Sequence, residues 1–195
     1  NDGYLLQYFV QRGVPVLGVE PAGKVAAVAK QKGIPSVVKF FGVKTARELA
    51  KKKKRADLVI GNNVLAHVPN INDFVGGLKI LLKPKGITME FPHLMRLMAE
   101  NQFDTIYHEH FSYLSLLAVE RVFAKHGLTL FDVEELPTHG GSLRIYARHS
   151  KDVSKPVGSR ITELRDREAQ AGFDTLQHYL NFASQVETTK RKLLT

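Results

Sequence analysis

The segment Tyr107-His108-Glu109-His110-Phe111 places a phenol, two imidazoles and a carboxylate side by side. Such a set can move protons, because histidine titrates near neutral pH, a carboxylate can fix its tautomer, and a tyrosine hydroxyl can donate a hydrogen bond. It can also bind a metal ion or form a polar corner without chemistry. His108 and His110 would share a face only on an extended segment, whereas zinc-binding histidine pairs on helices lie four residues apart. No third ligand is evident, so no metal is expected here, and the acid/base and structural interpretations stay open.

The elements that must position this segment follow an α/β pattern. Short apolar runs alternate with helix-like patterns, which is typical of parallel β/α units. The pattern predicts helices over 3–13, 22–33, 44–55, 71–86 and 116–127, and strands over 15–20, 34–41, 56–63, 87–91, 128–136 and 142–149. Only "PTHGG" separates the last two strands, which is too short for a crossover helix, so this pair is expected to be antiparallel. The sequence therefore predicts a doubly wound, mostly parallel sheet with a terminal antiparallel strand.

The character of the chain changes near residue 150. "SKDVSKPVGSR" has the composition of a linker, and 160–195 has helical patterns without a strand. We expect a core over 1–150, followed by a linker and the helical start of a second domain over 151–195. The chain opens at Asn1 with neither a methionine nor a strand before the first helix, so we also expect the first strand of the fold to be missing.

Composition excludes several classes of protein. The absence of cysteine excludes disulfides, cysteine-ligated zinc and a thiol nucleophile within this chain. No apolar run is long enough to span a membrane, so we expect a cytoplasmic protein without a membrane partner. The net charge of +9 is concentrated in 39–55, where lysines and arginines greatly outnumber the single acid, Glu48. No aromatic residues are interleaved with this run to stack on bases, so it is interpreted as a solvated helix end and no nucleic-acid partner is expected.

Residues suited to a nucleotide-like cofactor follow the expected strand ends, where ligands bind in such sheets. Gly3 in "NDGY" leads into a helix N-terminus, and Glu20 ends the next strand at a spacing suited to binding ribose hydroxyls. This pair does not separate NAD from S-adenosylmethionine, although the lack of a full G-x-G-x-x-G motif disfavours NAD. For Glu20, an acid at the start of the next helix is the competing interpretation.

Two further strand ends carry candidates for cofactor contact. Phe40 or Phe41 would stack on an adenine ring, with a core position as the alternative. Asn62 and Asn63 end a strongly apolar strand and are poor strand formers, so a cofactor would explain their amides, with a turn or capping role as the alternative. His67 follows on the next turn.

Taken in order, several segments closely resemble the sugar C-methyltransferase family: "NDGYLL", "GVEPA", "ADLVIGNNVLAHVPN", "EFPHL", "YHEHFSYLS" and "THGGSLRIYA". Members of that family use S-adenosylmethionine to methylate C-3 of nucleotide-linked 4-keto-deoxysugars. The resemblance covers 1–150, and 160–195 is similar to the opening of the family's C-terminal domain. "YHEHFSY" and "HGGSLR" are its specific motifs. It implies a Rossmann-like class I methyltransferase fold.

The resemblance also implies residue roles. His110 would be the general base that forms an enolate, with Tyr107 and Glu109 positioning the base and the sugar. The donor would contact Asp2, Gly3, Glu20, Phe41, Asn62 and Asn63. The candidates for contacting the nucleotide-sugar partner are His108, His139, Ser142 and Arg144. The guanidinium fork of Arg144 suits a phosphate, although an ordinary surface arginine is the alternative.

Compared with the family pattern, we expect the N-terminal cysteine-rich zinc domain to lie outside this chain, and zinc to bind only in that domain. We also expect the C-terminal domain to be cut short, and "KPKGITMEF" is about one residue shorter than usual in the family. Three functions compete with C-methylation: a sugar or small-molecule O- or N-methyltransferase with the same donor site, an NAD-dependent sugar oxidoreductase, and a non-catalytic binding module. The missing glycine motif argues against the oxidoreductase, and the retained "YHEH" argues against the binding module. The oligomeric state is left open.

Overall fold

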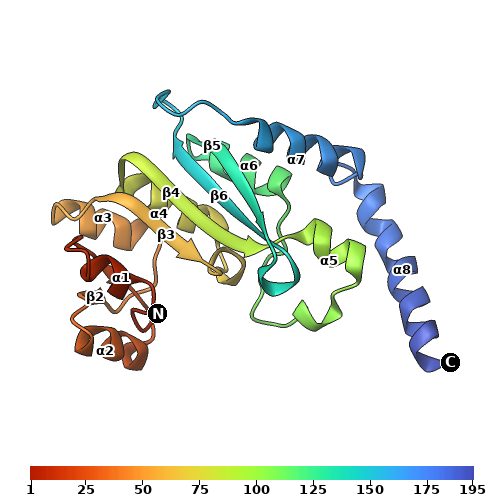
Figure 1. Cartoon of the computed structure of the whole chain (residues 1–195), viewed down its shortest axis with the longest axis horizontal. Helices are drawn as coiled ribbons and strands as arrows, with labels where there is room; N and C mark the ends of the chain where they lie inside the picture. Colours follow the sequence, from red (N-terminus) through yellow and green to blue (C-terminus); the bar gives the residue numbers. More distant parts are fainter.

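The computed structural model describes residues 1–195 and contains an α/β body from which one long helix extends (Figure 1). The helices are α1 (Leu6–Val10), α2 (Gly23–Gln31), α3 (Val43–Lys51), α4 (Ile71–Leu81), α5 (Leu94–Glu100), α6 (Leu116–Lys125), α7 (Ser159–Gln170) and α8 (Leu176–Leu194). The strands are β1 (Gly18–Val19), β2 (Ser36–Val37), β3 (Ala56–Asn62), β4 (Leu82–Pro92), β5 (Leu128–Leu136) and β6 (Ser142–His149). Short 3-10 turns lie at η1 (Leu65–His67), η2 (Phe103–Thr105) and η3 (Thr138–Gly140). No helix is long and apolar enough to cross a membrane.

The main sheet is mixed, with the order β3-β4-β6-β5. β3 and β4 are parallel, whereas β6 is antiparallel to both β4 and β5. β1 and β2 form a separate parallel pair. The predicted α/β fold with a mixed sheet and an antiparallel final strand is confirmed, but the main sheet is not mostly parallel, because only β3 and β4 pair in parallel within it and β1 and β2 pair apart.

Three element predictions were wrong in detail. The strands expected over 15–20 and 34–41 each shorten to two residues, because β1 and β2 pair only with one another. The helix expected over 71–86 ends at Leu81, and the next residues begin β4 instead. Pro84 cannot continue a helix, since it has no N–H and its ring clashes with the preceding turn. Helix α5 was not predicted.

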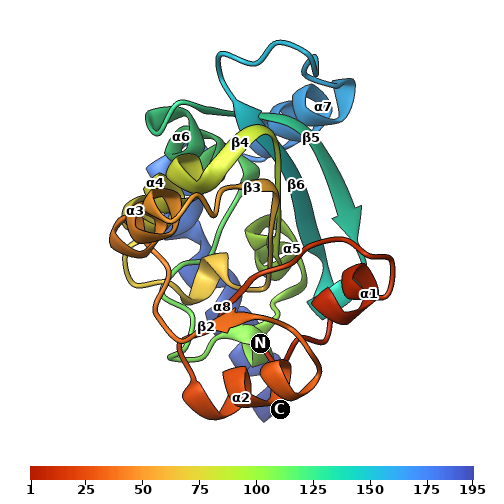
Figure 2. The same cartoon turned by 90° about the vertical axis from the view of Figure 1, so that its left-hand side faces the viewer.

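One face of the main sheet holds the principal core. Alternate residues of β4 and β6 point into it, among them Phe91 and Ile145, and α4, α6 and α7 cover it. Figure 2 shows α3, α4 and α6 on one side of the sheet. Since side chains alternate along a strand, the remaining residues of β4 and β6 line the opposite face.

That opposite face carries a row of polar side chains in register across four strands: Asn62, Glu90, Arg144 and Glu134. Arg144 Nη2 donates to Glu90 Oε2 at 2.8 Å, and its Nη1 lies 3.5 Å from Glu134 Oε2. The row ends beside the carboxyl ends of the parallel strands β3 and β4, where the candidate site lies.

The segment after residue 150 begins with a helix that packs into the main core. Ile161 and Leu164 of α7 are completely buried within the same cluster as the sheet residues. By contrast, α8 has no buried residue and extends away from the body (Figure 1). The division near 150 stays a prediction, but α7 contacts the core directly.

Candidate active site

The two histidines of "YHEH" lie on the histidine loop, defined here as residues 106–115 between η2 and α6. The loop is fixed in its middle, because the N–H groups of Phe111 and Ser112 both donate to the Ala66 carbonyl, at 2.8 and 3.3 Å. Ala66 belongs to η1, directly before His67. The loop is therefore anchored beside the turn that follows β3.

His110 is buried among aromatic rings. Its ring centroid lies 4.7 Å from that of His67, 4.3 Å from that of Tyr107 and 5.5 Å from that of Tyr113. The Nε2 atom of His110 is buried and has no hydrogen-bond partner. A buried polar atom without a partner costs stability, so it calls for an explanation such as a bound ligand or a role in proton transfer.

Burial sets the protonation state of His110. Desolvation lowers the pKa of this imidazole below its ordinary value of 6.5, and the neighbouring His67 lowers it further. A backbone hydrogen bond with Thr105 and the charge of Glu109 oppose the shift without reversing it. His110 is therefore neutral at neutral pH, which is the form that accepts a proton.

A cavity of about 360 Å³ opens beside His110. It is lined by Asn63, Pro92, Gln102, Asp104, Thr105, Tyr107, His110, His139 and Gly140. Four of the predicted site residues thus meet at one place: Asn63, Tyr107, His110 and His139. Asn63 and His139 both adopt the left-handed backbone region, with φ near 51° and 52°. That conformation is costly for non-glycine residues and is found disproportionately at functional sites.

Four other predicted residues lie near the cavity without lining it. His108 and Glu109 are exposed on the histidine loop. The Ser142 hydroxyl is buried and donates to the Thr138 carbonyl at 2.9 Å. The guanidinium of Arg144 is already held by Glu90 and Glu134, so it offers no free fork to a phosphate. The substrate roles of these residues stay predictions.

Three of the residues expected to bind S-adenosylmethionine lie near the start of the chain: Asp2, Gly3 and Glu20. One Glu20 oxygen accepts from the Ala22 N–H at 2.8 Å, as in the competing interpretation of this residue. The contact between Glu20 and a ribose hydroxyl stays a prediction. Asp2 pairs with Lys32 at 2.7 Å.

Gly3 is held by packing. Its φ is +82°, and a Cβ at this position would overlap the Ile34 side chain, so only glycine fits. The contact between Gly3 and S-adenosylmethionine stays a prediction.

The other two donor candidates lie in different surroundings. Phe41 packs edge-on against Phe74, with 5.3 Å between centroids, at the border of the main core. Phe40, the alternative considered for the adenine ring, is largely exposed. Asn62 stands opposite Glu90 in the polar row.

Sequence reasoning gave no role to several residues at the site. Gln102 and Asp104 line the cavity only through tertiary structure, and nothing in their local sequence distinguishes them. His67, which follows the asparagines on the next turn, contacts the His110 ring. Glu90 had a signal, because it interrupts the apolar strand "ITMEF". Its carboxylate is nearly buried and accepts from Thr138 Oγ1 at 3.1 Å and from Arg144 at 2.8 Å, which fixes the turn that carries His139.

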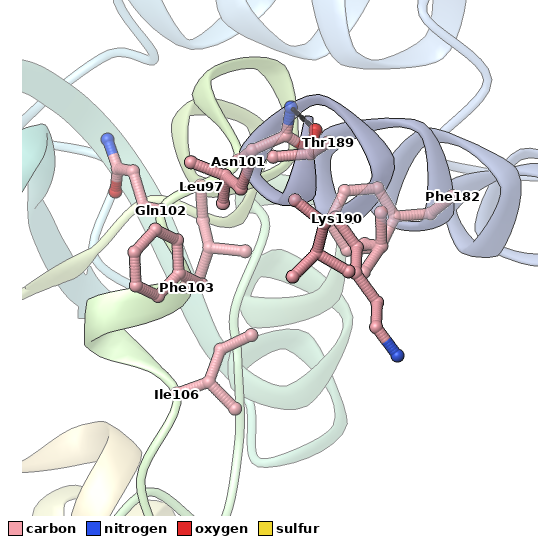
Figure 3. Close-up of a pocket in the computed structure, with 11 residues that line it drawn as sticks. Leu97, Asn101, Gln102, Phe103, Ile106, Phe182, Thr189 and Lys190 are labelled. Atoms are coloured by element: carbon pink, nitrogen blue, oxygen red, sulfur yellow. Dashed lines mark hydrogen bonds between the residues drawn. The ribbon is translucent and has the colours of Figure 1, made fainter.

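A second cavity of about 330 Å³ shares Gln102 with the first and is mainly apolar. Figure 3 shows Leu97, Phe103 and Ile106 on one side of it and Phe182 and Lys190 of α8 on the other. The amide of Asn101 donates to Thr189 Oγ1 at 3.0 Å across it (Figure 3). The η2 segment therefore separates the polar cavity from an apolar one.

Comparison with known proteins gives two family matches. Residues 1–133 match the model of a methyltransferase domain, and residues 137–195 match that of a C-methyltransferase C-terminal domain. The chain is 35% identical over 194 residues to C-methyltransferase NovU of Streptomyces niveus, which covers 99% of this chain and 46% of that protein. It is 28% identical over 85 residues to a ubiquinone biosynthesis O-methyltransferase of Rhodopseudomonas palustris, covering 44% of this chain and 34% of that protein. The chain thus spans less than half the length of these relatives.

Solved structures support the same fold. Magnesium protoporphyrin IX methyltransferase from Synechocystis PCC 6803 with bound S-adenosylmethionine superposes with a TM-score of 0.56 at 17% identity, covering 76% of this chain and 66% of that one. The PH0226 protein of Pyrococcus horikoshii OT3 gives a TM-score of 0.59 at 19% identity, covering 76% and 77%. At these identities the likeness shows the class I methyltransferase fold alone, and that predicted fold is confirmed.

Proposed function

The chain belongs to the methyltransferase-domain family, and from that premise we propose that it is the core of an S-adenosylmethionine-dependent C-methyltransferase. The proposed acceptor is the carbon next to the ketone, C-3, of a nucleotide-linked 4-keto-deoxysugar. The observation that carries the proposal is the unpartnered Nε2 of His110, which is buried beside a polar cavity and next to Tyr107. The resemblance to sugar C-methyltransferases and the similarity to NovU support this acceptor class.

Methylation at carbon requires a nucleophile that the protein must create. A carbon beside a ketone becomes nucleophilic when it loses a proton and forms an enolate. Nε2 of neutral His110 has a free lone pair in one tautomer and faces no competing donor, so it is suited to take that proton. When bound, S-adenosylmethionine supplies an electrophilic methyl group, which needs no further activation.

The charge that develops on the ketone oxygen needs a hydrogen-bond donor. Tyr107 lines the same cavity as His110, with its ring 4.3 Å away, and its hydroxyl can donate to that oxygen. His67 also contacts the His110 ring and disfavours the charged imidazolium. Protonated His110 is therefore a stronger acid than an ordinary imidazolium, so it can release the proton that it takes from the substrate.

The donor site would be formed at the carboxyl ends of β1 and β3. Glu20 would accept a hydrogen bond from a ribose hydroxyl through the oxygen that does not bond the Ala22 N–H, and Asn63, which lines the cavity, would contact the methyl donor. The N–H of Asn63 is already used by the Glu90 carbonyl at 2.7 Å, which leaves its side-chain amide for a ligand.

Two experiments test the proposal. Calorimetric titration of the protein with S-adenosylmethionine and with NAD should show binding of S-adenosylmethionine, and binding of NAD alone would refute the donor assignment. In deuterated water, His110→Asn should stop deuterium exchange at the carbon next to the ketone of a nucleotide-linked 4-keto-deoxysugar. His126→Asn, on a histidine that bonds Asn72 away from the cavity, is the matched control and should exchange normally. Exchange by His110→Asn at the wild-type rate would remove His110 from the role of base.

A further inference from the structure

Two ionisable side chains outside the cavity are almost completely buried and face one another. Glu168 of α7 is 0% exposed and His93, between β4 and α5, is 3% exposed. Oε1 of Glu168 lies 2.7 Å from Nε2 of His93. Buried charged groups need full hydrogen bonding, so the remaining contacts of this pair are informative.

Glu168 accepts hydrogen bonds from the free N–H groups at the N-terminus of α6. Its Oε1 accepts from the N–H of Leu116 at 2.7 Å, and its Oε2 accepts from the N–H of Leu117 at 2.9 Å. Ser115 Oγ accepts from the next N–H, that of Ala118, at 3.2 Å. The first N–H groups of a helix have no partner within the helix, and a negative charge there also complements the helix dipole. One carboxylate from α7 thus fixes the point at which the histidine loop ends.

His93 connects the same carboxylate to the other borders of the cavity. Its N–H donates to the Gly141 carbonyl at 3.0 Å, and it bridges to Leu114, the next-to-last residue of the histidine loop. Pro92, directly before His93, lines the cavity, as does Gly140. The Glu168–His93 pair therefore touches the end of β4, the turn before β6 and the histidine loop.

We propose that Glu168 is a positioning residue, which holds the histidine loop through the start of α6 and through His93 and so keeps the His110 ring at the cavity. This rests on the proposed function, in which His110 is the base. Through Glu168, α7, which follows the expected linker, takes a direct part in arranging the cavity beside His110.

Glu168→Gln is the most conservative test. A glutamine keeps the shape but has only one acceptor oxygen, so its NH₂ must face either the Leu117 N–H or the donors at the other oxygen. Glu163→Gln makes the same chemical change on an exposed position of α7 and serves as the matched control.

Hydrogen exchange of the whole chain gives a readout that needs no substrate. In Glu168→Gln, the amides of Phe111 and Ser112 should exchange roughly tenfold faster than in the control, because the loop opens locally. The amides of β6 should keep their protection. Unchanged protection at Phe111 and Ser112 would overturn the proposal, and so would an equal loss across β6, which would show a role in overall stability alone.

Two variants of His93 separate the effect of its ring N–H, which faces Glu168, from the effect of its size. His93→Leu removes the N–H donor and should speed hydrogen exchange at the amides of Phe111 and Ser112. His93→Gln can place an N–H near the position of Nε2, so its exchange rates should stay close to those of the wild type. In methyl transfer by the protein, Glu168→Gln should lower kcat with little change in KM for the donor. If the wild-type protein transfers no methyl group, the proposed function fails, while the exchange experiment still decides the positioning role.

Discussion

Replacing Glu90 by glutamine should destabilise the protein by breaking the polar row behind the cavity. The carboxylate is about nine-tenths buried and accepts from Arg144 Nη2 at 2.8 Å and from Thr138 Oγ1 at 3.1 Å. A glutamine oxygen can keep one of these bonds, but its NH₂ then faces a donor. A hydrogen bond to a charged group contributes about 1.5–3 kcal/mol. The Arg144 side chain is 35% exposed and keeps Glu134, so solvent and the second carboxylate reduce the loss to about 1–2 kcal/mol.

Urea unfolding of four proteins measures this coupling: wild type, Glu90→Gln, Arg144→Gln and the double variant. If the two side chains stabilise one another, the double variant should lose about 1 kcal/mol less than the sum of the single variants. Glu163→Gln should change the free energy of unfolding by less than about 0.5 kcal/mol, as surface substitutions usually do. Additive losses would refute the reasoning, since they would mean that the ion pair seen at 2.8 Å contributes nothing.

Three further predictions concern the site and its support. Because burial holds the pKa of His110 below 6.5, methyl transfer should stay at its plateau down to that pH and fall only below it. As the pH falls, the unfolded chain binds this proton before the folded chain does. The contribution of His110 to the free energy of unfolding is therefore complete above pH 6.5 and is lost between 6.5 and the folded pKa. A fall in methyl-transfer rate that begins above pH 6.5 would contradict this. Gly77→Ala should cost about 1–3 kcal/mol in urea unfolding, because its Cβ would lie 2.8 Å from the backbone of the turn before α3, whereas Gly86→Ala has space and should cost less; equal costs would refute the packing argument. Leu164→Ala in α7 should cost about 2–5 kcal/mol by opening a cavity in the core, against little for Leu176→Ala on α8, and a small loss at Leu164 would show that α7 does not belong to the core.

The strands of the main sheet were largely predictable from the sequence. β5 and β6 have the predicted bounds, and β3 differs by one residue at its end. Their apolar runs are long, and "PTHGG" permits only a tight antiparallel connection. The two-residue strands β1 and β2 were overestimated because strand length depends on neighbouring strands, which local sequence does not report. Helix α5 was missed because it follows the proline of "EFPHL" and is only seven residues long, although Leu94, Leu97 and Met98 have helical spacing.

The site was predictable only where a local signal existed. Asn63 was indicated by polar residues at a strand end and His139 by the motif "HGGSLR", and both line the cavity with His110. Pairing between distant segments could not be predicted in this way. Glu168 and Glu163 look alike in the sequence, yet one is completely buried against α6 and the other is exposed. Likewise, the ion pair between Arg144 and Glu90 depends on the strand register, which places the two residues opposite one another.

The product of methyl transfer tests the central claim most directly. The protein would be incubated with a nucleotide-linked 4-keto-deoxysugar and S-adenosylmethionine carrying a ¹³C-labelled methyl group, and the product would be examined by NMR. We expect the labelled methyl to be bonded to the carbon next to the ketone, and no such product with His110→Asn. A labelled methyl bonded to oxygen or nitrogen, or an undiminished carbon product with His110→Asn, would contradict the proposal.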